Sequence, residues 1–396
     1  MAIKRIDELG AATPLLTDFL PATPTGGPST KATVRQLYES NIFAVSVAYT
    51  GIAPAPFGAI VSAKSGAQSG STLTIPDGVT IETFVYSNGP STTLTYANLA
   101  GIRSTFTMAT WASLTSLSFP VLAFTGVNFD PNTMAALTTI SIPALTYVGG
   151  NYQFTSMGAL TSLSAPLLTY VGGNYQVAPG AFALTTISAP LLTYVGGNYQ
   201  VNSLNLITSL SAPLLTYVGG NYVVNTHSSL TTLSNPLLAY VGGSYYTSYM
   251  ALLTTLSAPA LTSVGVNLAR TVFTGGNIEP YQMAALTTLT FPVIEVIGSI
   301  SSISINITSQ TAALSTFTLG STLRRVNGNV TITSCALLVA SVDGVLVRLA
   351  ALNGAGLTTA YSSKTVTITG TSATPSATGL AAKATLVARG CTVTHN

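Results

Sequence analysis

The stretch that decides the fold runs Leu160-Thr-Ser-Leu163-Ser-Ala-Pro166-Leu-Leu168-Thr-Tyr170-Val171-Gly172-Gly173-Asn174-Tyr175-Gln-Val177. Close copies of this stretch follow one another along the chain, joined by short variable connectors. The proline recurs in steps of 23 or 24 residues, at Pro120, Pro143, Pro166, Pro190, Pro213, Pro236 and Pro259. A unit this short cannot bury its own apolar side, so successive copies must stack and share one core. The sequence therefore predicts a solenoid.

The positions within the repeat predict how each turn is built. Proline cannot donate to a β-ladder, so a proline at one fixed point marks a corner between strands. The Gly-Gly pair marks a bend or a close approach between neighbouring turns. We expect the recurring apolar residues to point inward, at the positions of Leu160, Leu163, Leu168 and Val171. The position of Leu167 varies among Ala, Leu and Val, and we expect it to point partly outward.

The spacing L-x-x-L-x-x-P-x-L-x-x-V-G-G-N-Y-x-V resembles the leucine-rich repeats of receptor L domains and of bacterial surface antigens. The resemblance implies an all-β fold, a right-handed parallel β-solenoid of about 23-residue repeats, which we expect over residues 71–340. Tyrosine stands where the resembling pattern has leucine, and we expect this row to point inward as an aromatic stack. The row comprises Tyr152, Tyr175, Tyr199, Tyr222 and Tyr245.

Residues 1–40 carry a different pattern, I-x-x-L-x-x-A-x-x-L-x-x-x-D-x-L-P followed by T-K-A-T-V-x-Q-L. This pattern resembles the N-terminal segment with which tailed-phage fibre, spike and appendage proteins dock onto the virion. The resemblance implies a virion-anchoring role for Ile6, Leu9, Leu15, Asp18, Leu20, Lys31, Val34 and Leu37. The segment is too short to form a core, so we expect a partner to order it. Residues 41–70 are predicted to be a linker.

Residues 341–396 resemble the C-terminal end of phage and bacterial repeat proteins. The matching stretches are Val342-Asp343-Gly-Val-Leu346-Val-Arg-Leu349, Val366-Thr-Ile-Thr-Gly370 and the run from Thr374 through Lys383 to Val393. Cys391 stands where that pattern has tryptophan. A solenoid must cover its last exposed core, so we expect a small α/β cap here.

The composition excludes several classes of protein. Of 396 residues, 47% are hydrophobic and only 6% are charged, and the net charge of +3 is scattered. No basic patch is present, so nucleic acid is not an expected partner. Mean hydropathy is +0.52, but Thr, Ser, Asn and Gly interrupt every apolar run, so no membrane span is expected. Asp7 and Glu8 stand where a signal peptide has its apolar core, so we expect assembly in a cytoplasm.

Neither a cofactor nor a catalytic centre is predicted. Cys335 and Cys391 are too few for a disulfide framework and lack metal-ligand spacing. Glycoside hydrolysis needs two carboxylates across a cleft, yet residues 131–269 contain no Asp, Glu, Lys or Arg. The acids Asp130, Glu279 and Glu295 stand alone in their turns, and Asp77-Gly favours a turn. His227 lies in a polar connector without an acidic or Cys partner, and we expect it at the surface.

A second tyrosine row precedes the inward valines and is therefore expected to point outward; it comprises Tyr147, Tyr170, Tyr194, Tyr217 and Tyr240. Three interpretations are open: a ladder of rings stacked within one chain, a subunit interface, or a sugar-binding face. Asparagines at Asn151, Asn174, Asn198 and Asn221 are expected to hydrogen-bond along the stack. The longest connector, Ala269 to Ala285, is a candidate recognition loop or a solvated insertion, with Arg270, Phe273, Glu279 and Tyr281 as its notable residues.

These observations predict a non-enzymatic structural protein of a phage virion, a tail or neck fibre or spike. It would be assembled in the host cytoplasm and reside in the virion. Its predicted partners are other tail, neck or capsid proteins, two further copies in a homotrimer, and a host cell-surface glycan. The alternatives are a polysaccharide-degrading tailspike, a capsid decoration protein and a cellular surface adhesin.

Overall fold

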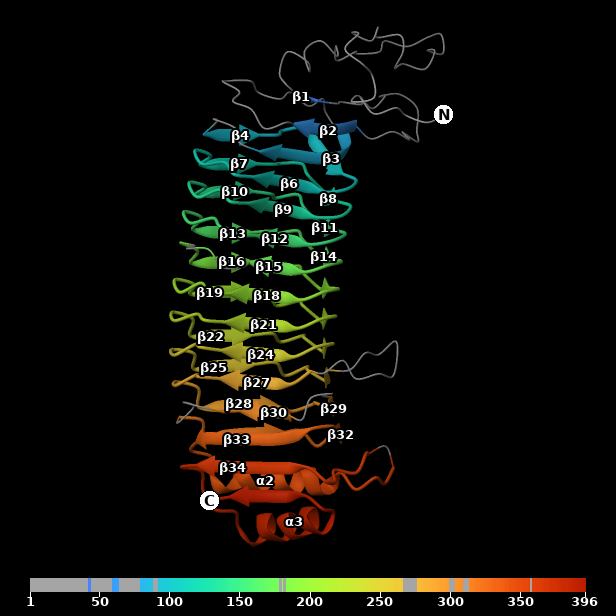
Figure 1. The fold of residues 1–396 in the computed structure, drawn as a ribbon, viewed down its shortest axis with the longest axis vertical. Coiled ribbons are helices and arrows are strands. Elements are labelled where there is room, and N and C mark those ends of the chain that lie inside the picture. The colour runs from blue at the N-terminus through green and yellow to red at the C-terminus, as the bar shows by residue number, and fades with distance from the viewer. Residues whose placement is uncertain are drawn as a thin grey trace.

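The structure is a computed structural model that describes residues 42–43, 59–63, 79–87, 92–177, 180, 183–265, 276–298, 303–308, 313–356 and 358–396. These residues form a tall stack of coils whose strands run across the long axis (Figure 1). Nearly all strand pairs are parallel, and each strand pairs with its equivalents in the turns before and after it. The predicted all-β fold, a parallel β-solenoid, is confirmed.

Each regular turn contains three short strands. One such turn comprises β13 (Ser162–Ser164), β14 (Tyr170–Val171) and β15 (Tyr175–Val177). The next comprises β16 (Thr186–Ser188), β17 (Tyr194–Val195) and β18 (Tyr199–Asn202). Equivalent residues lie opposite one another across the two turns. Every repeat position therefore becomes a column that runs along the solenoid.

The same three-strand pattern continues in both directions, from β4 to β33. Before β13 it comprises β4 (Thr93–Thr95), β5 (Leu99–Ile102), β6 (Phe106–Ala109), β7 (Ser116–Ser118), β8 (Phe124–Thr125), β9 (Phe129–Asn132), β10 (Thr139–Ser141), β11 (Tyr147–Val148) and β12 (Tyr152–Phe154). After β18 it comprises β19 (Ser209–Ser211), β20 (Tyr217–Val218), β21 (Tyr222–Asn225), β22 (Thr232–Ser234), β23 (Tyr240–Val241), β24 (Tyr245–Ser248), β25 (Thr255–Ser257), β26 (Ser263–Val264), β27 (Ile278–Tyr281), β28 (Thr288–Phe291), β29 (Val296–Ile297), β30 (Ile303–Ile307), β31 (Thr316–Leu319), β32 (Arg325–Val326) and β33 (Asn329–Cys335).

The stack begins before the regular turns. Strand β1 (Ile42–Phe43) pairs antiparallel with β2 (Ala59–Ala63), and β2 pairs parallel with β3 (Val79–Ser87). Strand β3 then pairs parallel with both β5 and β6. Parallel stacking thus reaches back into the range 41–70, which the sequence assigns to a linker.

The corners follow from proline and glycine. Pro166 lies in the turn directly after β13, as expected of a residue that cannot donate to a ladder. At the second corner, the amide of Gly172 donates to the carbonyl of Val148 at 2.8 Å. A Cβ placed on Gly172 would lie 2.1 Å from the carbonyl oxygen of Gly149 in the preceding turn. Neighbouring turns therefore approach too closely here for any side chain, which explains the recurring Gly-Gly pair.

The core is a continuous apolar column inside the coil. Leu160, Leu163, Leu168 and Val171 are each at most 1% exposed, so their predicted inward orientation is confirmed. Leu167 is 45% exposed and points outward. Burial of these recurring apolar residues in successive turns stabilises the stack.

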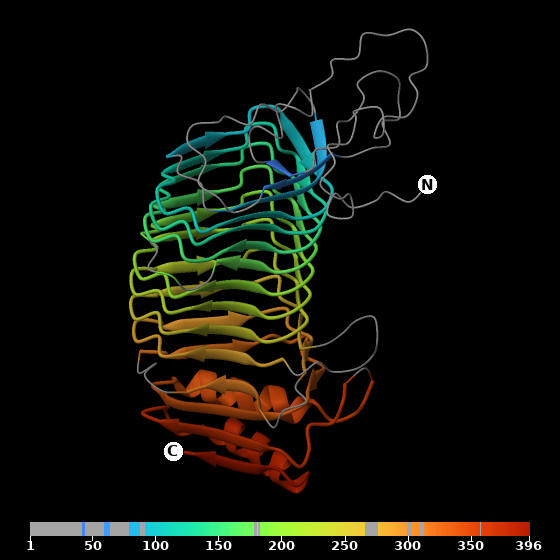
Figure 2. The ribbon, with the colours of Figure 1, turned by 45° about the horizontal axis from the view of Figure 1, so that its top comes forward.

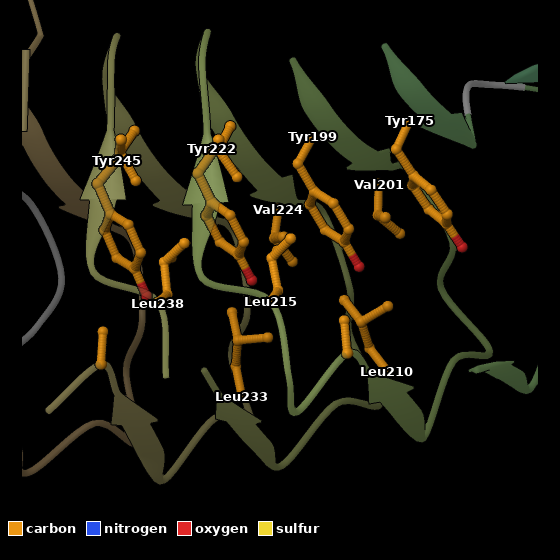
Figure 3. Close-up of a cluster of buried hydrophobic side chains, with 14 of the residues drawn as sticks. Tyr175, Tyr199, Val201, Leu210, Leu215, Tyr222, Val224, Leu233, Leu238 and Tyr245 are labelled. Atoms are coloured by element: carbon orange, nitrogen blue, oxygen red, sulfur yellow. The ribbon is translucent and has the colours of Figure 1, made fainter. Parts of the chain in front are cut away.

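The inner tyrosine stack, Tyr152, Tyr175, Tyr199, Tyr222 and Tyr245, lies within this core. Figure 3 shows the rings of Tyr175, Tyr199, Tyr222 and Tyr245 projecting from the third strands of consecutive turns toward the leucines of the opposite wall. The centroids of Tyr175 and Tyr199 lie 4.9 Å apart, and those of Tyr199 and Tyr222 lie 5.1 Å apart. The predicted inward aromatic stack is confirmed.

Side-chain hydrogen bonds reinforce the main-chain ladder from turn to turn. The Thr169 hydroxyl donates to the carbonyl oxygen of Thr146 at 3.0 Å, and this bond repeats along its column. In the asparagine row, Oδ1 of Asn151 accepts from the backbone amide of Asn174 at 2.8 Å. The asparagines thus bond along the stack. The side-chain oxygens of Asn151, Asn174 and Asn198 each accept from the backbone amide of the asparagine in the next turn, and not from its side-chain amide.

Residues other than glycine adopt the left-handed backbone conformation in a column at the end of the third strand of a turn. Thr133 has a φ of 52° and Ser203 a φ of 59°. The other members are Thr110, Ser156, Thr226, Tyr249 and Gln282. The amide of Ser203 donates to the carbonyl of Asn225 at 3.0 Å, so the ladder continues through this column. L-residues in this region cost about 1–2 kcal/mol, and the tertiary stack overrides that preference.

The C-terminal cap extends one sheet and replaces strands by helices on the other side. Strands β34 (Thr365–Gly370) and β35 (Thr392–His395) continue the parallel sheet from β33. Helices α2 (Val339–Ala351) and α3 (Ala377–Ala388) lie at the C-terminal end of the stack (Figure 2). The carboxylate of Asp343 on α2 accepts from the amide of Ser376, the N-cap of α3, at 2.9 Å. The predicted α/β cap is confirmed.

Candidate binding surfaces

The second tyrosine row forms an outer tyrosine ladder, comprising Tyr147, Tyr170, Tyr194, Tyr217 and Tyr240. Its rings are nearly parallel: Tyr170 and Tyr194 lie 4.8 Å apart at 1°, and Tyr194 and Tyr217 lie 4.8 Å apart at 1°. The geometry arises because these tyrosines begin in-register parallel strands one turn apart. The structure therefore brings together all five residues predicted for this row.

The stacking decides how the ladder can be used. Tyr170, Tyr194 and Tyr217, in the middle of the ladder, each have a neighbouring ring on both faces. Their ring faces are therefore occupied, and only the edges and hydroxyls remain at the surface. Exposure falls from 41% at Tyr147 to 7% at Tyr240. This geometry matches the first interpretation, a ladder of rings stacked within one chain. A sugar-binding face would need free ring faces, and the stacked rings do not offer them. Use of the ladder at a subunit interface stays a prediction.

Three tyrosines of the ladder, Tyr170, Tyr194 and Tyr217, carry no charge near neutral pH. Desolvation raises the pKa of Tyr170, Tyr194 and Tyr217, and the phenols of neighbouring tyrosines raise these pKa values further. The hydroxyls therefore remain neutral groups that can donate and accept hydrogen bonds.

Beside the proline corner runs a second outward column, the apolar ridge. Its members are Val121, Leu167, Leu191, Leu214 and Leu237, which are 37–45% exposed. Each follows a corner proline directly in the sequence. The sequence indicates the outward orientation from variability at this position, but only the structure shows that consecutive turns align these side chains into one exposed apolar column.

The predicted recognition loop is only partly described. Arg270 and Phe273 lie outside the described residues. Glu279 and Tyr281 do not belong to a protruding loop, because both lie in β27, opposite Tyr246 and Ser248 of the preceding turn. That part of the prediction is wrong. Ile278 lies at the position of the usual inward tyrosine, so the repeat is not recognisable there from the sequence although it continues.

The described residues on either side of the insertion, Gly265 and Gly276, place the extra residues between these two glycines and not between Ala269 and Ala285. Its two ends, Gly265 and Gly276, are close neighbours, since a Cβ built on Gly265 would lie 2.6 Å from the Cα of Gly276. Gly265 still donates its amide to Val241 as the first glycine of other corners does. Gly265 and Gly276 therefore occupy the two glycine positions of a single corner.

The three acids that the sequence analysis singles out, Asp130, Glu279 and Glu295, differ in burial and in their partners. Desolvation raises the pKa of half-buried Asp130. The Glu279 carboxylate accepts from the side-chain amide of Asn277 at 2.8 Å, and Glu295 lies 3.8 Å from Arg324 in an exposed ion pair. In the described part of the chain, no three His, Cys, Asp or Glu side chains gather where they could hold a metal ion.

His227 is buried, and its predicted surface position is wrong. Its Nδ1 lies 3.1 Å from the carbonyl oxygen of Leu204, and its Nε2 lies 3.0 Å from that of Val201. The residue occupies a column that holds Leu204 in the turn before and Met250 in the turn after. The residues next to His227 in the sequence are polar, so the sequence does not indicate that His227 belongs to an apolar column. Desolvation lowers the pKa of His227, while its two carbonyl contacts oppose that shift.

The eight residues predicted to anchor the protein to a virion lie outside the described residues. They are Ile6, Leu9, Leu15, Asp18, Leu20, Lys31, Val34 and Leu37. Neither helix found in the described ranges is long and apolar enough to cross a membrane.

Comparison with known proteins gives no relative. No protein-family model, no curated protein and no solved structure matches the chain.

Proposed function

We propose that the protein is a non-enzymatic structural component of a tailed-phage virion, a tail or neck fibre or spike. Residues 1–40 attach it to other virion proteins, and the solenoid projects to bind a host surface glycan or neighbouring subunits. The proposal includes a homotrimer that is assembled in the host cytoplasm and resides in the virion. It rests on the N-terminal pattern, which resembles the docking segment of phage appendage proteins, and on the cap pattern, which resembles the C-terminal end of phage and bacterial repeat proteins.

The observation that supports this role best is the solenoid itself. It holds uniform outward columns over many turns, with no charged residue between Pro131 and Ala269. A long stack with repeating outer surfaces suits projection and multivalent contact. The fold alone does not specify the function, because solenoids serve many roles.

A deletion tests the anchoring role. Removing residues 2–38 should leave a folded solenoid that no longer enters virions, because every described strand lies beyond the deleted segment. Circular dichroism checks folding, and immunoblotting of purified particles measures incorporation. Normal incorporation of the truncated chain would contradict the proposal.

The non-enzymatic part has a separate test. The described carboxylates of the two turns that follow the insertion, Glu279 and Glu295, are engaged with Asn277 and Arg324. The purified protein should therefore leave host polysaccharide at full length. Release of shortened oligosaccharides by the wild type, abolished by Glu279→Gln with Glu295→Gln, would assign catalysis to these two adjacent turns and contradict the proposal.

A further inference from the structure

We infer that the apolar ridge is the surface along which a second copy of this chain packs. The ridge is a line of branched aliphatic side chains: Leu167 and Leu237 are each 45% exposed, and Leu191 and Leu214 are 38% and 37% exposed. Single exposed leucines are ordinary on protein surfaces, but contiguous exposed apolar patches mark interaction sites. The inference names a contact surface for the self-association that the proposed function includes and rests on that part of it, but it is argued from the surface of the solenoid alone.

The repeat of the ridge favours this partner over others. Consecutive members lie one or two turns apart, and a turn rises by the strand spacing of about 4.8 Å. The ring spacing of 4.8 Å in the adjoining tyrosine ladder agrees with that rise. A partner can interdigitate along the whole line only if its side chains repeat at the same interval. A second copy of the chain satisfies that condition by construction.

Charge points to the same partner. The ridge from Leu167 to Leu237 adjoins no charged residue of its own segment, because residues 131–269 contain none. A charged partner surface would lose hydration here and gain no counter-charge. The corresponding surface of a second copy is equally uncharged, so two ridges can meet without burying an unpaired ion.

The residues around the ridge suit the rim of an interface. Ser164 precedes the corner and Thr169 follows it, and both are exposed hydroxyl residues. An apolar centre with a polar, uncharged surround is the usual composition of stable interfaces, which are depleted in charge at their core. At about 4.8 Å per turn, the five turns from Val121 to Leu237 span about 24 Å.

Sedimentation velocity on the full chain tests the inference. The ridge variant combines Leu167→Gln, Leu191→Gln and Leu214→Gln, and the control combines Leu206→Gln with Leu252→Gln. The control leucines are 54% and 53% exposed and lie outside the ridge. The wild type and the control should self-associate. The ridge variant should dissociate about tenfold or more readily, with an unchanged thermal midpoint.

A second variant covers the case in which the triple change disturbs folding. Leu191→Cys keeps the other ridge leucines, and mild oxidation should link two copies through it, whereas Leu252→Cys should link poorly. The natural thiols, Cys335 and Cys391, are buried. A monomeric wild type, equal dissociation of the control, or equal cross-linking at both cysteines would overturn the inference. Loss of virion incorporation with self-association intact would instead contradict only the proposed function.

Discussion

Replacing Tyr199 by leucine measures what the inner tyrosine stack contributes to stability. Tyr199 is 2% exposed, and its ring stacks on Tyr175 at 4.9 Å and on Tyr222 at 5.1 Å, with interplanar angles of 9° and 4°. An aromatic pair contributes about 0.5–1.5 kcal/mol beyond area burial, so two pairs contribute about 1–3 kcal/mol. The smaller leucine also leaves a cavity that costs on the order of 1 kcal/mol. We expect a total loss of about 2–4 kcal/mol in unfolding free energy.

The matched control is Tyr199→Phe, which keeps the ring and both stacking contacts. Urea denaturation followed by circular dichroism should show the leucine variant unfolding at clearly lower urea, with the phenylalanine variant within about 1 kcal/mol of wild type. If Tyr199→Leu and Tyr199→Phe unfold at the same urea concentration, the stacked rings add nothing beyond apolar burial. The tyrosines would then be only large space-filling residues in a leucine column.

Three further changes probe other columns of the stack. Leu168→Asp places an unpaired charge in the dry core and should unfold neighbouring turns, whereas Thr169→Asp on the exposed side loses only the hydrogen bond to Thr146 and should lower the thermal midpoint far less; equal midpoints would refute the inward assignment. Thr133→Gly should raise the unfolding free energy by on the order of 0.5 kcal/mol, because relief at a φ of 52° exceeds glycine's entropy cost, while Ser209→Gly within a strand should lower it. Burial lowers the pKa of His227 below 6.5, so its neutral form stabilises the fold fully above that pH and stability declines as pH falls below it. The urea midpoint should show this decline, and His227→Leu should remove it.

Periodicity predicts the fold well because stacking converts each repeat position into a column with one environment. The inward leucines, the proline corners and the inner tyrosine stack follow directly from that rule. The sequence also predicts the outward direction of the ladder tyrosines. It leaves open which surfaces they contact, because a column's direction does not reveal whether neighbouring rings cover one another.

The errors occur where a residue departs from its column's usual chemistry. His227 is polar in an apolar column, and its polar sequence neighbours suggest solvent. Ile278 replaces a tyrosine after an insertion, so Glu279 is assigned to a loop although it lies in β27. The left-handed column consists of residues other than glycine, for example Thr133 with a φ of 52°. Their residue types therefore do not indicate this backbone conformation. In each case the tertiary stack overrides the local sequence preference.

In-register stacking also explains why the repeats carry almost no charge. A charged residue at a repeating position would lie about 4.8 Å from its copies above and below, where like charges repel by about 1 kcal/mol in water and more near a protein surface. Thr232 and Thr255 are exposed partners in adjacent strands, so they can test this cost. Thr232→Lys with Thr255→Lys should be less stable than the sum of the single changes by about 1 kcal/mol. Added salt should shrink this penalty, whereas Thr232→Lys with Thr255→Glu should show none. If the two double variants are equally stable at low salt, charge repulsion between turns does not account for the composition of the repeats.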